Sequence, residues 1–168
     1  MHWRLSHRYD PRALPLADRH YSRQKPGTPQ FVPPGRNLVL LTESADALWV
    51  TSWPKPEFTK HDWAGAWVNS LFRNESPCLA SELILDAVAA TRAKWTPPPL
   101  GLVTFVDETK IRHKRDPGRC YRKAGFNLVG RTKKDSLLVW QLLPSEMPEP
   151  VPALPMFSRQ LELDWRLQ

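Results

Sequence analysis

Proline is the residue that most strongly limits where this chain can form helices and strands, because 18 of its 168 residues are prolines. Each proline lacks a backbone N–H and fixes φ, so it disrupts the interior of a helix or of a central strand. Most of the prolines gather in four clusters, at 11–34, 54–56, 97–99 and 144–155. We therefore expect the regular elements to lie in the intervals between these clusters.

Three short apolar runs between positions 37 and 72 have the composition of β-strands. Asn37–Thr42 and Ala47–Trp53 are rich in β-branched and large apolar residues, and the four residues from Glu43 to Asp46 separate them. This spacing predicts a hairpin or a closely connected antiparallel pair. Ala64–Phe72 has the same character and predicts a third strand.

A helical period follows these strands. Apolar residues recur at 79, 83, 84, 87 and 88, in keeping with a helix that buries one stripe. We expect this helix to begin near Ser76, with Pro77 in its first turn, and to end before Pro97. Leu100–Val106 is apolar almost throughout, as expected for a central strand covered on both faces.

The last third of the chain predicts a short helix and a second hairpin. Arg119–Ala124 is followed by Gly125, a residue that commonly ends helices. Asn127–Thr132 and Leu137–Leu143 are two further strand-like runs, joined by a short polar turn.

This order of elements predicts a mixed α/β fold, with a central mixed and mostly antiparallel sheet flanked by helices. We expect residues 37–144 to form the core of one domain. Residues 1–36 are expected to add an irregular or helical segment to that domain, and residues 145–168 to form a proline-rich tail.

The composition predicts a cytoplasmic protein that has neither a membrane partner nor a metal centre. No run of about 18 apolar residues is present, and the N-terminus mixes charges with prolines instead of carrying the apolar centre of a secretory signal. The two cysteines, Cys78 and Cys120, are too few for a disulfide framework, and no histidine cluster accompanies them.

The charge of the chain favours an anionic partner. Its 24 Lys and Arg residues exceed its 17 Asp and Glu residues, which gives a formal net charge of +7. The excess is concentrated between positions 110 and 134, where Asp116 is the only acidic residue. This run is either a nucleic-acid-binding surface or a solvated basic face. Its basic residues are Lys110, Arg112, Lys114, Arg115, Arg119, Arg122, Lys123, Arg131, Lys133 and Lys134.

The order of elements around residues 121–126 (YRKAGF) resembles the second half of the GNAT superfamily of N-acetyltransferases, over roughly residues 38–143. The resemblance implies that an acyl donor such as acetyl-CoA inserts between the strands on either side of the long helix. It also implies that the hydroxyl of Tyr121 protonates the departing thiolate, and that the start of the long helix binds the pyrophosphate of the donor. The residues expected at that cofactor site are Arg73, Asn74, Ser76 and Ser81.

One departure from the family concerns this pyrophosphate loop. The family carries glycines there, whereas residues 72–81 of this chain contain none, and Pro77 removes one amide donor. We therefore leave open whether the cofactor is acetyl-CoA or another acyl donor.

A narrower resemblance is to phage DNA-modification proteins of the Mom type, which are divergent members of the same superfamily. The similarity rests on small size, basic balance, His20-Tyr21-Ser22 and Arg73-Asn74-Glu75. It implies a phage or prophage protein that transfers an amide-bearing group to adenine N6 in DNA and thereby blocks restriction.

We expect three polar groups to meet at one edge of the sheet and to form the catalytic site. Glu75 or Asp107, with a pKa raised in a partly dry cleft, would remove a proton from the attacking nitrogen, and Tyr121 would act as the acid. Each also has a structural interpretation. Glu75 would complement a helix dipole, Asp107 would stabilise a turn, and Tyr121 would be a core aromatic residue.

The expected substrate contacts come from two other segments. His20 and Tyr21 would stack on a flipped base, with Ser22 beside them. The basic run would bind phosphates, through Lys110, Arg112, Lys114, Arg115, Arg119 and Arg122.

Three functions remain at this stage: a nucleic-acid-modifying acyl-type transferase, an acyl-CoA-dependent N-acetyltransferase of a small amine or protein, and a non-catalytic DNA-binding protein of the same fold. DNA is the expected partner in the first and third cases. A homodimer is left open.

Overall fold

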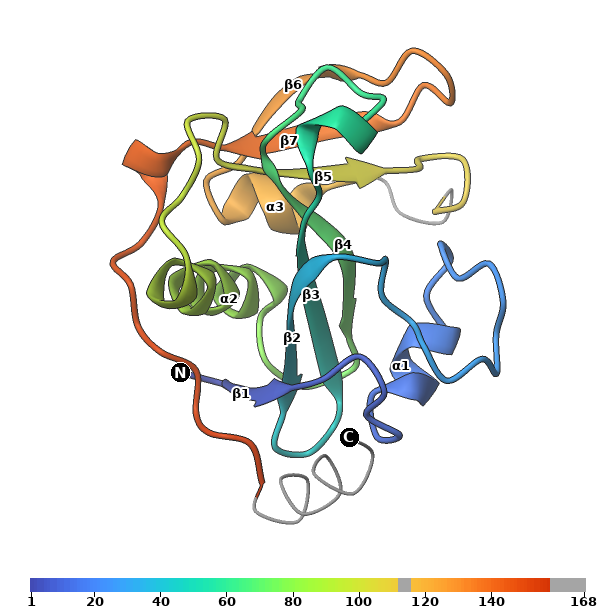
Figure 1. Ribbon diagram of the computed structural model, residues 1–168, viewed down its shortest axis with the longest axis vertical. Coiled ribbons are helices and arrows are strands. Elements are labelled where there is room, and N and C mark those ends of the chain that lie inside the picture. The colour runs from blue at the N-terminus through green and yellow to red at the C-terminus, as the bar shows by residue number, and fades with distance from the viewer. Residues whose placement is uncertain (112–115, 158–168) are drawn as a thin grey trace.

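The computed structural model describes residues 1–111 and 116–157, which form a mixed α/β fold around a seven-stranded, mostly antiparallel sheet (Figure 1). The strand order is β1-β2-β3-β4-β5-β7-β6, and β4 and β5 are the only parallel neighbours among the described strands. In chain order the elements are β1 (Trp3–Ser6), α1 (Leu14–Asp18), β2 (Arg36–Thr42), β3 (Ala47–Trp53), the 3-10 helix η1 (Pro56–Phe58), β4 (Trp67–Asn74), α2 (Ala80–Lys94), β5 (Leu102–Val106), α3 (Arg119–Lys123), β6 (Asn127–Arg131), β7 (Leu138–Leu142) and the 3-10 helix η2 (Pro144–Glu146).

The sheet splits between β4 and β5. These two strands pair over three positions only, the last of which joins Asn69 to Thr104. Beyond that point β4 continues beside β3 as far as Asn74, and β5 continues beside β7 as far as Val106. The split therefore leaves polar edges of two strands facing each other at the centre of the sheet.

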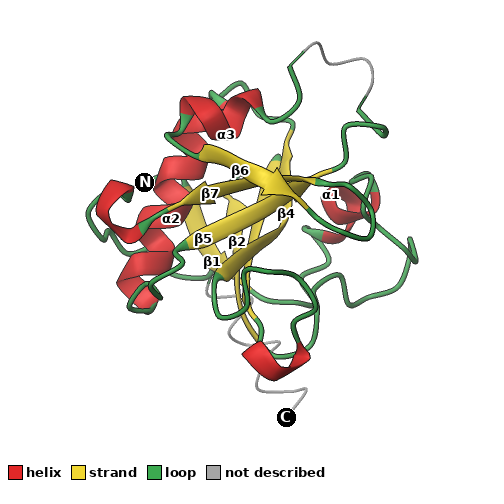
Figure 2. Cartoon of the chain, turned by 90° about the horizontal axis from the view of Figure 1, so that it is seen from above, coloured by secondary structure: helices red, strands yellow, loops and turns green. Residues whose placement is uncertain are grey.

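Both faces of the first half of the sheet are covered. Side chains alternate along β2, so that Leu38 and Leu40 pack in the core under α2, whereas Val39 and Leu41 pack in the core under α1. Figure 1 shows α1 and α2 on opposite sides of β2, β3 and β4. Figure 2 shows the strands between these helices from above. This three-layer arrangement explains why the central strands are apolar almost throughout.

The predicted long helix is present, but it begins later than expected. Its first residue is Ala80, and Leu79 precedes it with extended backbone. Ser76 and Pro77 therefore belong to the loop between β4 and α2. The buried stripe includes Leu83 and Ile84 and one turn later Ala87 and Val88, as the period predicts.

The N-terminal segment contributes a strand that the sequence did not predict. β1 pairs with β2 at the edge of the sheet, and the tail pairs with β1 in turn. The Leu5 N–H donates to the Leu154 carbonyl at 2.8 Å, and the Leu154 N–H donates to the Trp3 carbonyl at 2.9 Å. The described part of the tail is thus fixed to the domain through backbone hydrogen bonds. A smaller difference is that β4 begins at Trp67 and not at Ala64.

Candidate functional site

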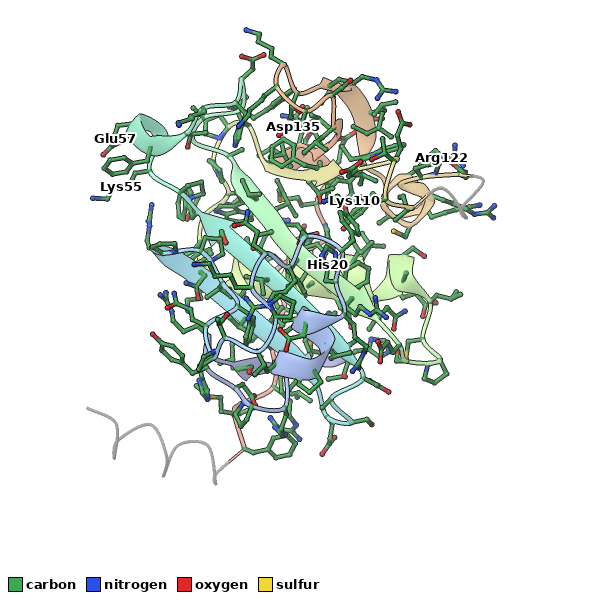
Figure 3. The ribbon with its side chains drawn as sticks, turned by 90° about the vertical axis from the view of Figure 1, so that its right-hand side faces the viewer. His20, Lys55, Glu57, Lys110, Arg122 and Asp135 are labelled. Atoms are coloured by element: carbon green, nitrogen blue, oxygen red, sulfur yellow. The ribbon has the colours of Figure 1, made fainter. Side chains whose placement is uncertain are left out.

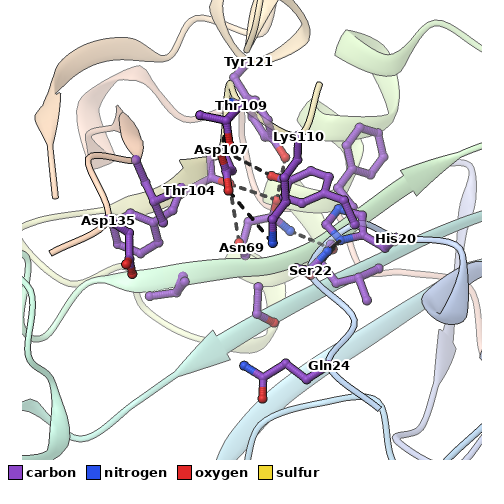
Figure 4. A pocket seen from close by; sticks show the side chains of 17 residues that line it. His20, Ser22, Gln24, Asn69, Thr104, Asp107, Thr109, Lys110, Tyr121 and Asp135 are labelled. Carbon is purple, nitrogen blue, oxygen red and sulfur yellow. Dashed lines mark hydrogen bonds and ion pairs between the residues drawn. The ribbon is translucent and has the colours of Figure 1, made fainter. Parts of the chain in front are cut away.

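A cavity of about 660 Å³ opens where β4 and β5 separate (Figure 4). Its walls come from five parts of the chain: the segment after α1 between residues 20 and 24, residues 68–72 of β4, the end of β5 with the following turn, Tyr121 of α3, and the turn between β6 and β7. Of the predicted site residues, the structure brings six to this cavity. They are His20, Tyr21, Ser22, Asp107, Lys110 and Tyr121.

Asn69 is buried at the base of the split, where its side chain links β3, β4 and α3. Its Nδ2 donates to the carbonyls of Val50 at 3.1 Å and Leu71 at 2.9 Å. The register between β3 and β4 shifts here, since Val50 faces Leu71 while Thr51 faces Asn69. The side-chain amide therefore satisfies carbonyls at a β-bulge, and this requirement orients its oxygen away from them.

Tyr121 uses the oxygen of that amide. Its hydroxyl donates to Asn69 Oδ1 at 2.8 Å, and Thr104 Oγ1 lies 3.4 Å from the same oxygen. Burial raises the pKa of Tyr121 well above its ordinary value, so the hydroxyl keeps its proton at neutral pH. The ring packs against Phe72 and Phe126 in edge-to-face geometry. Tyr121 is therefore both a core aromatic residue and a protonated group at the cavity.

Asp107 lies at the rim of the cavity, directly after β5. Its Oδ1 accepts hydrogen bonds from the Thr109 hydroxyl at 2.6 Å and the Thr109 N–H at 3.0 Å, while Lys110 Nζ lies 4.0 Å from Oδ2. These contacts, with the Thr109 side chain foremost, lower the pKa of Asp107. The raised pKa that we expected for this carboxylate is therefore wrong, because the turn that binds it stabilises its charged form.

His20 and Tyr21 form an aromatic wall of the cavity. Their rings stack with centroids 4.5 Å apart and an interplanar angle of 27°. His20 Nδ1 lies 2.7 Å from the Ser22 hydroxyl, and the Tyr21 hydroxyl lies 3.5 Å from the backbone nitrogen of Asp107. Burial raises the pKa of Tyr21, so this ring is also neutral. Figure 3 shows His20 close to Lys110, on the face that carries α1.

Glu75 does not line the described cavity and has a different role. It accepts hydrogen bonds from Arg19 at 2.7 and 2.8 Å and from Arg73 at 2.8 Å. The hydrogen bonds and positive charges of these two residues lower its pKa from 4.5 to about 2. The raised pKa expected for Glu75 is wrong, because two guanidinium groups stabilise its charged form. Glu75 ties the segment after α1 to the end of β4.

This ion pair predicts a pH effect on stability. The folded-state pKa of Glu75 is depressed, so its contribution is present above about pH 4.5 and is lost as the pH falls toward about 2. We expect Glu75→Gln to remove that contribution, about 1 kcal/mol for an exposed pair, at neutral pH. Urea unfolding at pH 7 and pH 3 measures it, with exposed Glu149→Gln as the control. A difference from wild type that is the same at both pH values would contradict this assignment.

The predicted pyrophosphate loop binds several of its own polar groups. Asn74 Oδ1 accepts hydrogen bonds from the N–H of Ser76 at 2.9 Å and from its hydroxyl at 2.6 Å, and the Ser76 hydroxyl accepts one from the Cys78 N–H at 3.2 Å. Two of the loop's amides, those of Ser76 and Cys78, thus bind the side chains of Asn74 and Ser76. Arg73 is engaged with Glu75, and Ser81 lies in the first turn of α2. None of the four predicted cofactor residues lines the described cavity.

The basic run is only partly directed at the cavity. Lys110 lines it, whereas Arg119 and Arg122 on α3 do not, and Figure 3 shows Arg122 apart from His20. Arg122 pairs with Asp116. Acids outside the run neutralise other members of it, since Arg131 pairs with Glu108 at 2.7 Å and Lys133 with Asp62 at 3.4 Å. Three further predicted phosphate contacts, Arg112, Lys114 and Arg115, lie outside the described residues.

The sequence reasoning missed two residues at the base of the site, Asn69 and Thr104. Both are buried polar residues inside otherwise apolar strands. A polar side chain in such a run needs a hydrogen-bond partner. That signal was available in the sequences WVNSLF and LVTFV.

Residues 1–111 and 116–157 contain no group of three His, Cys, Asp or Glu residues placed to hold a metal ion. They also contain no helix with the length and apolar character needed to cross a membrane.

The fold and the site together define a mixed α/β protein with a polar cavity at the split between two parallel strands. No protein-family model, curated protein or solved structure matches the chain.

Proposed function

We propose that this protein is an acyl-type group transferase with a GNAT-like fold that modifies a base of nucleic acid, with adenine N6 in DNA as the acceptor. The observation that carries the proposal is the buried, protonated Tyr121, held by Asn69 at a cavity between two diverging parallel strands. Support for the GNAT-like part comes from the strand order and from α2, which connects β4 to β5.

The acid function is assigned to Tyr121. In acyl transfer a bond forms between the donor's carbonyl carbon and the acceptor nitrogen, the bond to the leaving atom breaks, and that atom needs a proton. The Tyr121 hydroxyl donates a hydrogen bond to a neutral acceptor, Asn69 Oδ1. A leaving atom that gains negative charge is a stronger acceptor than an amide oxygen, so the proton is drawn toward it as the bond breaks.

The base function is assigned to Asp107. A carboxylate with a lowered pKa is a weak base and cannot deprotonate a neutral amine. The attacking nitrogen becomes cationic and strongly acidic once it has bonded to carbon, and an ionised carboxylate is then a sufficient acceptor. Asp107 lines the same cavity as Tyr121, so one bound substrate can reach both groups.

The acceptor is assigned from the aromatic wall. Stacked His20 and Tyr21 offer a flat surface for a base taken out of its stack. Lys110 at the rim is exposed and supplies positive charge for a phosphate. A cavity of about 660 Å³ is large enough for a nucleoside.

The donor is assigned only as an acyl compound. In the loop before α2 the amides of Ser76 and Cys78 and the Ser76 hydroxyl are engaged internally, and glycines are absent, so the loop departs from the pyrophosphate site that the GNAT resemblance implies. This disagreement disfavours an ordinary acyl-CoA-dependent N-acetyltransferase.

Salt-dependent binding tests the nucleic-acid part of the proposal. We expect the logarithm of the affinity for single-stranded DNA to fall linearly with the logarithm of salt concentration, by about 0.7 for each phosphate contact. Lys110→Gln should reduce the slope by about 0.7, as one phosphate contact requires. Lys55→Gln, which Figure 3 shows far from His20, is the control. Absence of DNA binding, together with acylation of a small amine, would favour the N-acetyltransferase alternative.

A further inference from the structure

A second, smaller cavity of about 300 Å³ adjoins the first. Phe105, Asp135 and Leu137 line both cavities and therefore form the boundary between them. The second cavity adds two aromatic side chains, His61 and Trp63, from the connection between η1 and β4. The two cavities thus form neighbouring compartments on one surface.

Three half-buried aromatic rings surround this second cavity. The centroids of His61 and Phe105 are 4.9 Å apart, those of Trp63 and Phe105 are 6.4 Å apart, and those of His61 and Trp63 are 6.3 Å apart. The backbone N–H of Trp63 donates to His61 Nδ1 at 3.1 Å, which fixes the position of the imidazole. Burial lowers the pKa of His61, so the ring is neutral at pH 7 and behaves as a stacking surface.

Lysines surround the aromatic rings. Lys60, Lys133 and Lys134 line the cavity, and the acids beside them are Asp62 and Asp135. Lys133 pairs with Asp62 at 3.4 Å, which joins the connection after η1 to the turn between β6 and β7. This contact spans the two sides of the cavity at its exposed rim. Aromatic rings combined with lysines are the combination that binds single-stranded nucleic acid.

We propose that this cavity, lined by His61, Trp63 and Phe105, binds the base of the nucleotide next to the acceptor, while the surrounding lysines bind the connecting phosphates. The inference rests on the proposed function, since it takes the acceptor base to occupy the first cavity. Stacking accepts any base, because every base has a π-face, so the subsite contributes affinity and strand position without sequence preference. We assign a nucleotide of the same strand as the occupant, because the two cavities share one wall and neighbouring nucleotides of a strand are joined by a single phosphate.

Affinity for short defined strands tests this subsite. The probes are four single-stranded pentanucleotides. One is abasic at every position, and one has a central adenine among abasic residues. The other two have that adenine and one additional base, on its 5′ or its 3′ side. The four strands carry equal charge, so a difference in affinity reports base contacts. We expect the central adenine to raise affinity over the fully abasic strand, and one of the two additional bases to raise it about ten-fold more.

Variants locate the second gain. Trp63→Ala and His61→Ala should each reduce the gain from the additional base to less than about two-fold, and leave the gain from the central adenine unchanged. Two variants are used because Trp63 also packs against a small apolar core. The control is Phe58→Ala, at the end of η1 just before this connection, whose side chain is 78% exposed and does not line the cavity.

The outcomes separate the subsite from the function on which it rests. A gain from the central adenine but none from either additional base would overturn the subsite alone. Equal gains in wild type and in both variants would also overturn it. Loss of the second gain when coenzyme A is added would assign the cavity to a nucleotide of the donor and overturn our proposal. Failure of the central adenine to raise affinity would overturn the proposed function as well.

Discussion

Replacement of Tyr121 by phenylalanine is expected to lower the rate of base modification by about 10²- to 10⁴-fold, the range that general acid catalysis contributes. The variant keeps the ring that packs against Phe72 and Phe126, so the core is retained. Only the hydroxyl that donates to Asn69 is lost, and the free energy of unfolding should fall by about 1 kcal/mol. The rate is measured as modified nucleoside formed per unit time in vitro.

The control for this prediction is Tyr9→Phe, since Tyr9 is 52% exposed and does not line the cavity. DNA affinity should be equal in wild type and in both variants. If Tyr121→Phe modified DNA at the wild-type rate, Tyr121 would be a core residue only, and the acid would have to be another group.

Replacement of Asn69 by alanine is expected to lower the free energy of unfolding by about 3 kcal/mol. The change removes the donor to two carbonyls, at Val50 and Leu71, and the acceptor for Tyr121. Each buried polar group without a partner costs about 1 to 3 kcal/mol, and water that enters the split will satisfy part of the loss. Urea unfolding measures the effect.

Ser70→Ala is the matched control for Asn69, because Ser70 is the adjacent bulge residue and makes one side-chain contact, 3.0 Å to Ser52. Its expected cost is about 1 kcal/mol or less. A loss below 1 kcal/mol for Asn69→Ala would mean that the amide does not hold the bulge and Tyr121 together.

Local periodicity accounts for the parts of the fold that the sequence predicted. The α2 stripe and the two hairpins depend on residues close together in the chain, and all three are present. β1 was missed because Trp3–Ser6 is short and mixes polar with apolar residues. Its stability comes from pairing with β2 and with Leu154, and no local pattern reports those distant partners.

The contrast between local patterns and distant partners also explains which properties of the site residues were predicted. Tyr121 and Asp107 were found from their positions after a short helix and a central strand, and both reach the cavity. The pKa of Glu75 was misjudged because its partner Arg19 lies 56 positions away in the chain. The starting point of α2 was misjudged because Asn74 forms side-chain hydrogen bonds within the preceding loop, which keep Ser76 out of the helix.

The most direct test of the proposed transferase activity is mass spectrometry of nucleosides from the DNA of cells that express this protein. Tyr121→Phe and an empty vector are the two controls, with equal amounts of folded protein verified for the variant. We predict a new modified deoxyadenosine that depends on the wild-type protein, is at least about 100-fold less abundant with Tyr121→Phe, and is absent with the vector. The mass of that nucleoside will identify the transferred group. The proposal would be contradicted if the DNA stayed unmodified and sensitive to restriction in cells that contain folded wild-type protein. A DNA-binding protein or an amine acetyltransferase would then be the alternatives.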